Sequence, residues 1–94
     1  MKEIKTAIKA EEIITLLEEG RNAKAEINKE GEAWIIPLEA YGYDETILTQ
    51  TFEAYDFEEL EKDKEAYIEW LKDCYSNEEL ETEDGEYQIT IEIK

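Results

Sequence analysis

The chain has 94 residues, of which 27 are acidic and 10 basic, for a formal net charge of -17. A charge of that sign disfavours binding to nucleic acid or to an anionic membrane, both of which need a basic patch, and predicts attraction to basic protein surfaces. With 41% hydrophobic and 11% aromatic residues the chain can still bury a core, so we expect one folded domain over residues 1–94.

Residue types that are missing or rare disfavour several chemistries. Histidine, the commonest general base and transition-metal ligand, is absent, and the single cysteine, Cys74, excludes an internal disulfide. No apolar run approaches the ~18–20 residues of a membrane span, and the charged first residues are unlike a signal peptide. We therefore expect a cytoplasmic protein that is not an enzyme and holds no metal or cofactor.

The first half of the chain predicts a helix followed by a hairpin. The helix begins at Thr6 or Ala10 and ends at Glu19, where Gly20 follows as a C-terminal glycine. Alternation predicts a strand over residues 23–28, a turn over residues 29–32, and a returning strand over residues 33–40. That alternation places Trp34 on a face with Ile36 and Leu38, so we assign it to the core, and it places Pro37 at an edge or a bulge.

The second half predicts a strand, a long helix and a final strand. Residues 46–55 are rich in Thr, Ile and Phe, and a helix follows from residue 56 or 57 to about Tyr75, with Asp56 as N-cap. Residues 76–79 have capping-box spacing and predict one more helical turn, and residues 86–94 alternate without a break. The predicted order is α-β-β-β-α-β, an α+β fold with helices packed on one face of a mainly antiparallel sheet.

The acidity is concentrated in residues 44–86, which hold 17 acidic residues and 3 lysines. On the wheel of one long helix, Glu65 and Glu69 lie within about 20° of Glu58, and Glu61 lies about 60° away. More acids follow this stripe in the chain. The predicted partner-binding residues are Glu58, Glu61, Glu65, Glu69, Trp70, Asp73, Glu78, Glu79, Glu81, Glu83 and Asp84.

Two features favour a contact surface over a merely solvated helix face, which stays open as the alternative. Like charges four residues apart destabilise a helix by roughly 0.2–0.5 kcal/mol per pair, and solubility needs a net charge of only ~2–8. Residues 56–73 also hold eight acids over about 26 Å of helix axis, where one DNA strand presents about eight phosphates. We expect the partner to be a basic protein surface, of a nucleic-acid-binding protein.

In size, acidity and its Glu-rich helix within an α+β chain, the sequence resembles the small DNA-mimic inhibitors of phages and mobile elements, which include anti-restriction and anti-CRISPR proteins. The resemblance is one of composition over residues 44–86 and transfers no single residue. It implies that the chain occupies the basic nucleic-acid channel of a host defence nuclease or another DNA-binding protein.

Two other functions are compatible with the same surface. One is an antitoxin or immunity protein that neutralises a basic toxin; barstar-like inhibitors are similarly small and acidic, but their order of elements differs from the one predicted here. The other is an acidic housekeeping interaction module.

Overall fold

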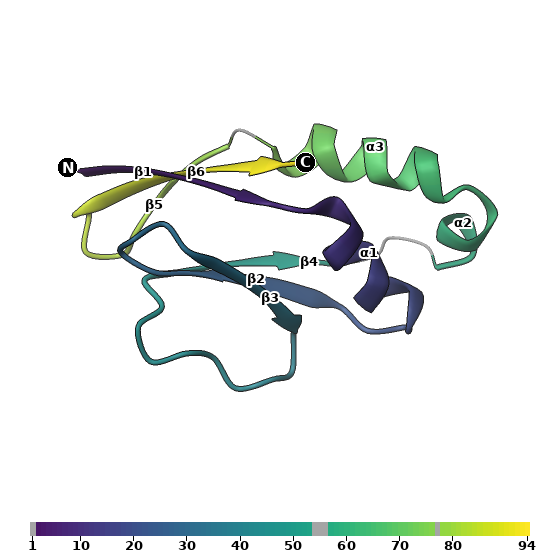
Figure 1. Cartoon of the computed structure of the whole chain (residues 1–94), viewed down its shortest axis with the longest axis horizontal. Coiled ribbons are helices and arrows are strands. Elements are labelled where there is room, and N and C mark those ends of the chain that lie inside the picture. Colours follow the sequence, from purple (N-terminus) through teal and green to yellow (C-terminus); the bar gives the residue numbers. More distant parts are fainter. Residues whose placement is uncertain (1, 54–56, 77) are drawn as a thin grey trace.

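The computed structural model describes residues 2–53, 57–76 and 78–94, which form six strands and three helices (Figure 1). In chain order these are β1 (Lys2–Ile8), α1 (Ala10–Glu18), β2 (Ala23–Ile27), β3 (Ala33–Pro37), β4 (Leu48–Phe52), α2 (Phe57–Lys62), α3 (Lys64–Tyr75), β5 (Glu79–Glu81) and β6 (Tyr87–Ile93). The α+β class is confirmed, and the predicted order of elements is contained in this series, with β1 and β5 as additional strands.

The strands form two sheets instead of the single sheet that we expected, one with the order β1-β6-β5 and the other β3-β2-β4. β1 and β6 are parallel from Lys2 opposite Tyr87 to Ile8 opposite Ile93, and the pairs β2–β3, β2–β4 and β5–β6 are antiparallel. Figure 1 shows the β1-β6-β5 sheet above the β3-β2-β4 sheet, the loop that follows β3 below the second sheet, and the helices toward one end.

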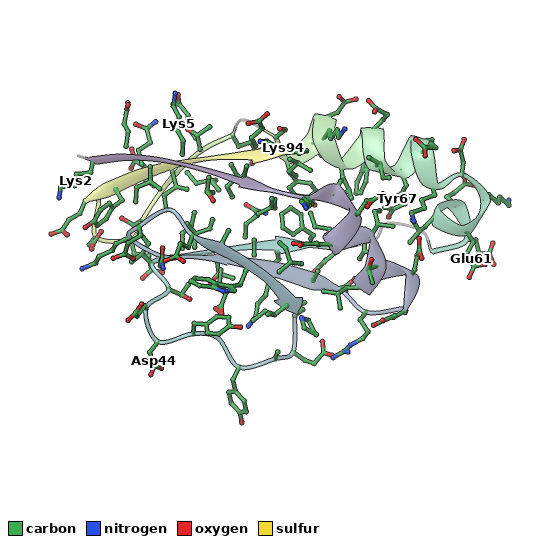
Figure 2. All side chains as sticks on the ribbon, viewed as in Figure 1. Lys2, Lys5, Asp44, Glu61, Tyr67 and Lys94 are labelled. Atoms are coloured by element: carbon green, nitrogen blue, oxygen red, sulfur yellow. The ribbon has the colours of Figure 1, made fainter. Side chains whose placement is uncertain are left out.

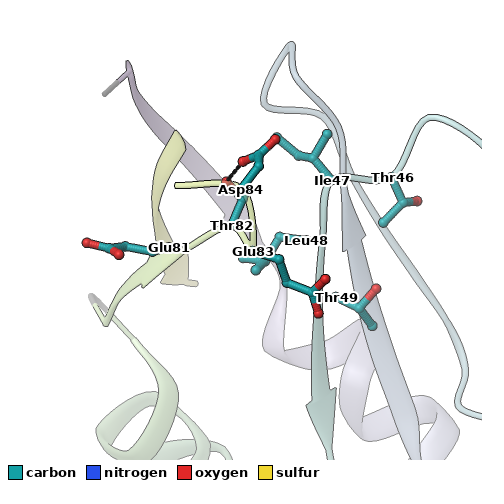
Figure 3. A pocket seen from close by; sticks show the side chains of 8 residues that line it. All are labelled: Thr46, Ile47, Leu48, Thr49, Glu81, Thr82, Glu83 and Asp84. Carbon is teal, nitrogen blue, oxygen red and sulfur yellow. Dashed lines mark hydrogen bonds between the residues drawn. The ribbon is translucent and has the colours of Figure 1, made fainter. Parts of the chain in front are cut away.

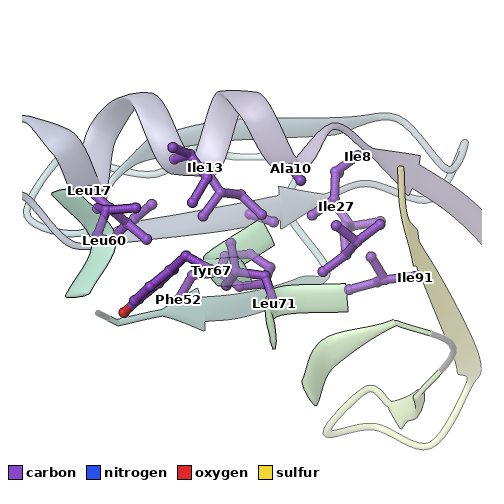
Figure 4. Close-up of a cluster of buried hydrophobic side chains, with 14 of the residues drawn as sticks. Ile8, Ala10, Ile13, Leu17, Ile27, Phe52, Leu60, Tyr67, Leu71 and Ile91 are labelled. Atoms are coloured by element: carbon purple, nitrogen blue, oxygen red, sulfur yellow. The ribbon is translucent and has the colours of Figure 1, made fainter. Parts of the chain in front are cut away.

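Both sheets and the helices share one core (Figure 4). Its buried side chains come from β1, β2, β4, β6 and the three helices, and they are Ile8, Ala10, Ile13, Ile14, Leu17, Ala23, Ala25, Ile27, Phe52, Leu60, Tyr67, Leu71, Ile89, Ile91 and Ile93. The alternation that predicted the last strand is confirmed, because three isoleucines of β6 all point into this core.

The N-terminal prediction missed β1 and is confirmed for α1. The helix begins at Ala10, whereas Thr6 belongs to β1, and Lys9 between them has an extended backbone. Gly20 has a φ of +77° and donates its N–H to the carbonyl of Leu17, so it ends the helix as predicted.

The inner and outer faces of β3 are reversed relative to the prediction. Ala33 and Ile35 pack against the core, whereas Trp34, which we had assigned to the core, lies opposite Glu26 on the other face of the sheet. Pro37 ends β3, which is an edge strand, as its missing N–H predicts.

The loop of residues 38–47 contacts the outer face of the β3-β2-β4 sheet. The rings of Trp34 and Tyr43 lie 5.0 Å apart, and the Tyr43 N–H donates to the carboxylate of Glu26 at 2.8 Å. The ammonium of Lys24 donates to the carbonyl of Ala40 at 2.7 Å. These contacts explain why Glu26, a strand residue on the outer face, is only 4% exposed.

Gly42→Ala is expected to lower the free energy of unfolding by roughly 1–3 kcal/mol, which is the cost of leaving a buried polar group without its hydrogen-bond partner. A Cβ at Gly42 would collide with the carboxylate of Glu26, which would have to leave the Tyr43 N–H. Urea denaturation followed by circular dichroism measures the change. The control is Tyr41→Ala, because that side chain is fully exposed and its loss should change stability by less than ~0.5 kcal/mol.

The predicted long helix is two helices, because the chain breaks at Asp63. The Asp63 N–H still donates to the carbonyl of Glu59, but its backbone is non-helical, with φ -147° and ψ 83°. Its carboxylate then accepts the N–H of Ala66 at 3.1 Å and caps α3. The predicted N-cap Asp56 lies outside the described residues.

Asp63→Ala is expected to lower the free energy of unfolding by roughly 0.5–2 kcal/mol, since it leaves an N-terminal N–H of α3 without its side-chain acceptor. Asp63→Asn keeps an acceptor oxygen and should restore most of the loss. Asp73→Ala removes an equal charge from the exposed side of the same helix and should change stability little. Thermal unfolding of the three variants decides whether the loss follows the cap or the charge.

The helical turn predicted over residues 76–79 is wrong. The Ser76 hydroxyl instead accepts the N–H of Ile93 at 3.0 Å, which ties the end of α3 to β6, and the chain continues into β5. A turn at Gly85, whose φ is +74°, then connects β5 to β6.

Candidate partner-binding surface

The ten predicted carboxylate residues are all exposed to solvent, and Trp70 is half-buried. They lie on three elements and two connecting segments. Glu58 and Glu61 are on α2; Glu65, Glu69 and Asp73 are on α3; Glu78 precedes β5; Glu79 and Glu81 are on β5; Glu83 and Asp84 are in the turn before β6.

The break at Asp63 divides the predicted stripe in two, so the single-helix wheel does not hold across it. Figure 2 shows Glu61 on α2 at the far end of the molecule. On α3, Glu65, Glu69 and Asp73 follow one another at four-residue spacing and therefore share one side of that helix. The buried residues of α3, Tyr67 and Leu71, lie on another side.

Residues 57–75 hold three lysines: Lys62 and Lys64 form ion pairs within the molecule, and Lys72 lies on α3 between Glu69 and Asp73 in the sequence. Lys64 lies 3.2 Å from the carboxylate of Glu18 and so joins the start of α3 to the end of α1. Lys62 lies 3.9 Å from Glu59, one helical turn away. Since both pairs are solvent-exposed, each adds little stability. Each places a cation next to an acid other than Glu65, Glu69 and Asp73, the three that share one side of α3.

Trp70 is half-buried and packs against the core, so only part of its side chain lies at the surface. Its ring lies 5.0 Å from that of Tyr67 and 6.2 Å from that of Tyr75, and it packs against the buried cluster. The ring of Tyr75 also meets Phe52 edge-on at 4.9 Å, and burial raises the pKa of the Tyr75 phenol. Trp70 therefore anchors α3, and only part of its ring can reach a partner.

Two of the carboxylates around β5 hold the hairpin together. Asp84 accepts the hydroxyl of Thr82 at 2.6 Å and the N–H of Glu86 at 3.0 Å, and the Thr82 hydrogen bond lowers the pKa of Asp84. Glu79 accepts the side-chain amide of Gln88 at 2.7 Å. The carboxylate of Asp84 therefore stabilises the turn, and Asp84 is a weaker candidate for partner contact than Glu81 and Glu83.

The hairpin turn borders a groove of about 580 Å³ that the sequence did not predict (Figure 3). Residues 81–84 line one side, and residues 46–49, which lead into β4, line the other. No local signal in the sequence could join these segments, because they lie more than 30 positions apart and in different sheets.

Along the molecule the acids form an extended series. α2, α3 and β5 succeed one another along the long axis in Figure 1, and the chain measures 42 × 26 × 17 Å. One DNA strand carries about twelve phosphates over 42 Å at ~3.4 Å each. Ten carboxylates over at most that length give a comparable density, although not on one straight helix as we had expected.

Known proteins give no further guidance, because no family model, curated protein or solved structure matches the chain. In residues 2–53, 57–76 and 78–94, no three histidine, cysteine or acidic side chains converge as a metal site would require. None of the helices in those residues is both long enough and apolar enough to cross a bilayer.

Proposed function

We propose that the chain is a cytoplasmic, non-enzymatic inhibitor that mimics DNA and occupies the basic nucleic-acid-binding channel of a host defence nuclease or another DNA-binding protein. The observation that supports this most is the series of ten exposed carboxylates along α2, α3, β5 and the following turn. Their density is close to that of one phosphate strand.

The physics of such a complex is electrostatic. A channel that binds DNA places lysines and arginines at phosphate spacing, and an acidic surface of similar density attracts them from a distance. The like-charged neighbours on α3, Glu65 with Glu69 and Glu69 with Asp73, repel each other in the free protein. Cations from a partner would relieve that repulsion. The repulsion lowers the stability of the free protein, and its relief therefore contributes favourably to the free energy of binding.

The experiment that tests this function is capture from host lysate on the immobilised chain, followed by elution with duplex DNA. A DNA mimic shares its binding site with DNA, so duplex should release the captured protein. Binding should also weaken at least about tenfold between about 50 and 200 mM salt.

Three results would count against the proposal. A captured protein that DNA does not displace indicates a basic toxin bound outside any DNA site, or an ordinary interaction module. Affinity that is independent of salt contradicts the electrostatic mechanism. Direct binding of DNA or RNA by the isolated chain contradicts the mimicry itself, because phosphate and carboxylate surfaces repel.

A further inference from the structure

The free edge of β3 is a second candidate interface, on a part of the molecule that the acidic series does not use. Within the described residues β3 forms strand pairing only with β2, while α1 and β1 pack beside it and the turn at Gly31 lies against Ile4 and Lys5 of β1. Leu38 donates its N–H to the carbonyl of Asn22, and Asn28 donates to Glu32, so even-numbered residues face β2. Because successive peptide groups alternate, the N–H groups of Ala33 and Ile35 face the open edge.

A groove of about 440 Å³ follows this edge. It is lined by residues 33–36 of β3, by Glu12, Thr15 and Leu16 of α1, and by Tyr43. Glu12, Thr15 and Tyr43 are exposed and the other lining residues are half-buried, so solvent reaches this part of the edge. A free strand edge that runs beside a helix is the arrangement into which an extended peptide can add as a further strand.

The two sides of the groove differ in chemistry. On the helix side, Leu16 is apolar, and the charged residues of α1 are all glutamates: Glu11, Glu12 and Glu18. On the outer side, Trp34 lies against Tyr43, whose side chain is 49% exposed. An added strand points alternate side chains to these two sides, so each side can select a residue.

We propose that the edge of β3 binds an extended, basic segment of a partner protein by strand addition, with alternating apolar and cationic side chains. Cationic side chains suit the outer side, where an Arg or Lys can stack on the rings of Trp34 and Tyr43, and Glu12 at the rim attracts a basic segment as a whole. Apolar side chains suit the helix side, where Leu16 is the apolar wall. A second copy of this chain is disfavoured, because two chains of charge -17 repel each other.

The probe is a capped hexapeptide in which lysine or arginine alternates with valine, added to the whole folded chain. We expect amide exchange at Ala33 and Ile35 to slow in nuclear magnetic resonance spectra when the peptide binds. The control peptide carries N-methyl groups on alternate amides, which keeps its charge and side chains. It should bind about tenfold more weakly, because it forms fewer main-chain hydrogen bonds.

A pair of proline variants tests the position. Ala33→Pro removes a donor from the open edge of β3 without breaking a bond to β2, and it should weaken the peptide about tenfold. Thr51→Pro is the matched variant on β4, which within the described part of the chain pairs only with β2. Residue 51 is exposed and lies opposite Lys24, and its replacement should leave peptide binding unchanged. If Ala33→Pro does not fold, the N-methylated peptide alone decides.

Two results would overturn strand addition: peptide contacts confined to α3 and β5, or equal binding of the two peptides. Either would show that the peptide is attracted only to the carboxylates along α2, α3, β5 and the following turn. That outcome leaves the proposed DNA mimicry standing. The opposite outcome is also possible: the peptide slows amide exchange at Ala33 and Ile35, but DNA does not displace the captured partner. That result would support strand addition and contradict the proposed DNA mimicry.

Discussion

Reversing Glu61, Glu69 and Asp73 to lysine is expected to weaken capture of the partner by at least about a hundredfold, because like charges placed opposite each other cost several kcal/mol at an interface. The three side chains are exposed and lie on α2 and α3. Glu61 is near the end of α2 and Asp73 near the end of α3, where a cation suits the helix dipole. The variant should therefore fold, as circular dichroism can verify.

The matched control reverses Glu30, Asp44 and Glu45, which changes the net charge of -17 by the same amount. These residues are exposed and border one surface beside the β2–β3 turn. Figure 2 shows Asp44 on the side of the molecule opposite α3. Capture should persist in the control. Equal losses in both variants would mean that overall charge, and not the surface on α2 and α3, controls binding.

A control built from reversed lysines would be less informative, because the chain does not separate its bases from its acids in space. The register of the β1-β6-β5 sheet places Lys5 opposite Thr90, and Thr90 opposite Glu79. Lys5 and Glu79 therefore share one face of that sheet, although the sequence places them at opposite ends of the chain. Charge counted along the sequence is a poor guide to charge on a surface.

Strands were predicted where the neighbouring strand is close in sequence or the alternation is strict. β2 and β3 follow each other through a short turn, and β6 alternates over its whole length. β1 was missed because its partner β6 lies at the other end of the chain, and parallel pairing leaves no local turn signal. In the sequence, Ile8 also lies one turn before the apolar stripe of Ile13, Ile14, Leu16 and Leu17, and this favours an early helix start.

The helix break had one local signal. On the wheel of a single long helix over residues 57–75, Lys64 falls on the apolar side between Leu60 and Phe57, where an unpaired charge is unfavourable. The structure resolves the misfit, because Lys64 is the first residue of α3 and pairs with Glu18. Asp63 is a suitable N-cap residue, but the charged run around it also suits a helix interior, so propensity could not decide.

The faces of β3 could not be decided locally either. Both of its alternating sets are apolar, since Ala33 and Ile35 stand against Trp34 and Ile36. The face shared by Trp34 and Ile36 was assigned to the core, yet β1 and α1 pack against β3, and the loop of residues 38–47 contacts its outer face. Tertiary packing set the orientation, and this is why an aromatic surface lies beside the open edge.

Ile91→Ala is expected to lower the free energy of unfolding by roughly 2–5 kcal/mol, the range for truncation of a core isoleucine. Ile91 is 1% exposed and lies in the middle of β6, the central strand of its sheet. Ile91 lies opposite Thr6 of β1, and on the other side of β6 the neighbouring Thr90 pairs with β5 while the Ser76 hydroxyl accepts the N–H of Ile93. The backbone around Ile91 is therefore fixed, and the surroundings cannot collapse into the space that is left.

Trp34→Ala, although it removes more atoms, is expected to cost less, about 1–2 kcal/mol. Trp34 is half-buried, lies outside the core cluster and loses mainly its contact with Tyr43, a pair worth about 0.5–1.5 kcal/mol beyond area. Water or the loop of residues 38–47 can fill the gap. Urea titrations followed by far-ultraviolet circular dichroism, which does not depend on tryptophan fluorescence, compare the two variants. A loss from Trp34→Ala that equals or exceeds that from Ile91→Ala would mean that this loop is part of the cooperative core and that the outer face of β3 is not available to a partner.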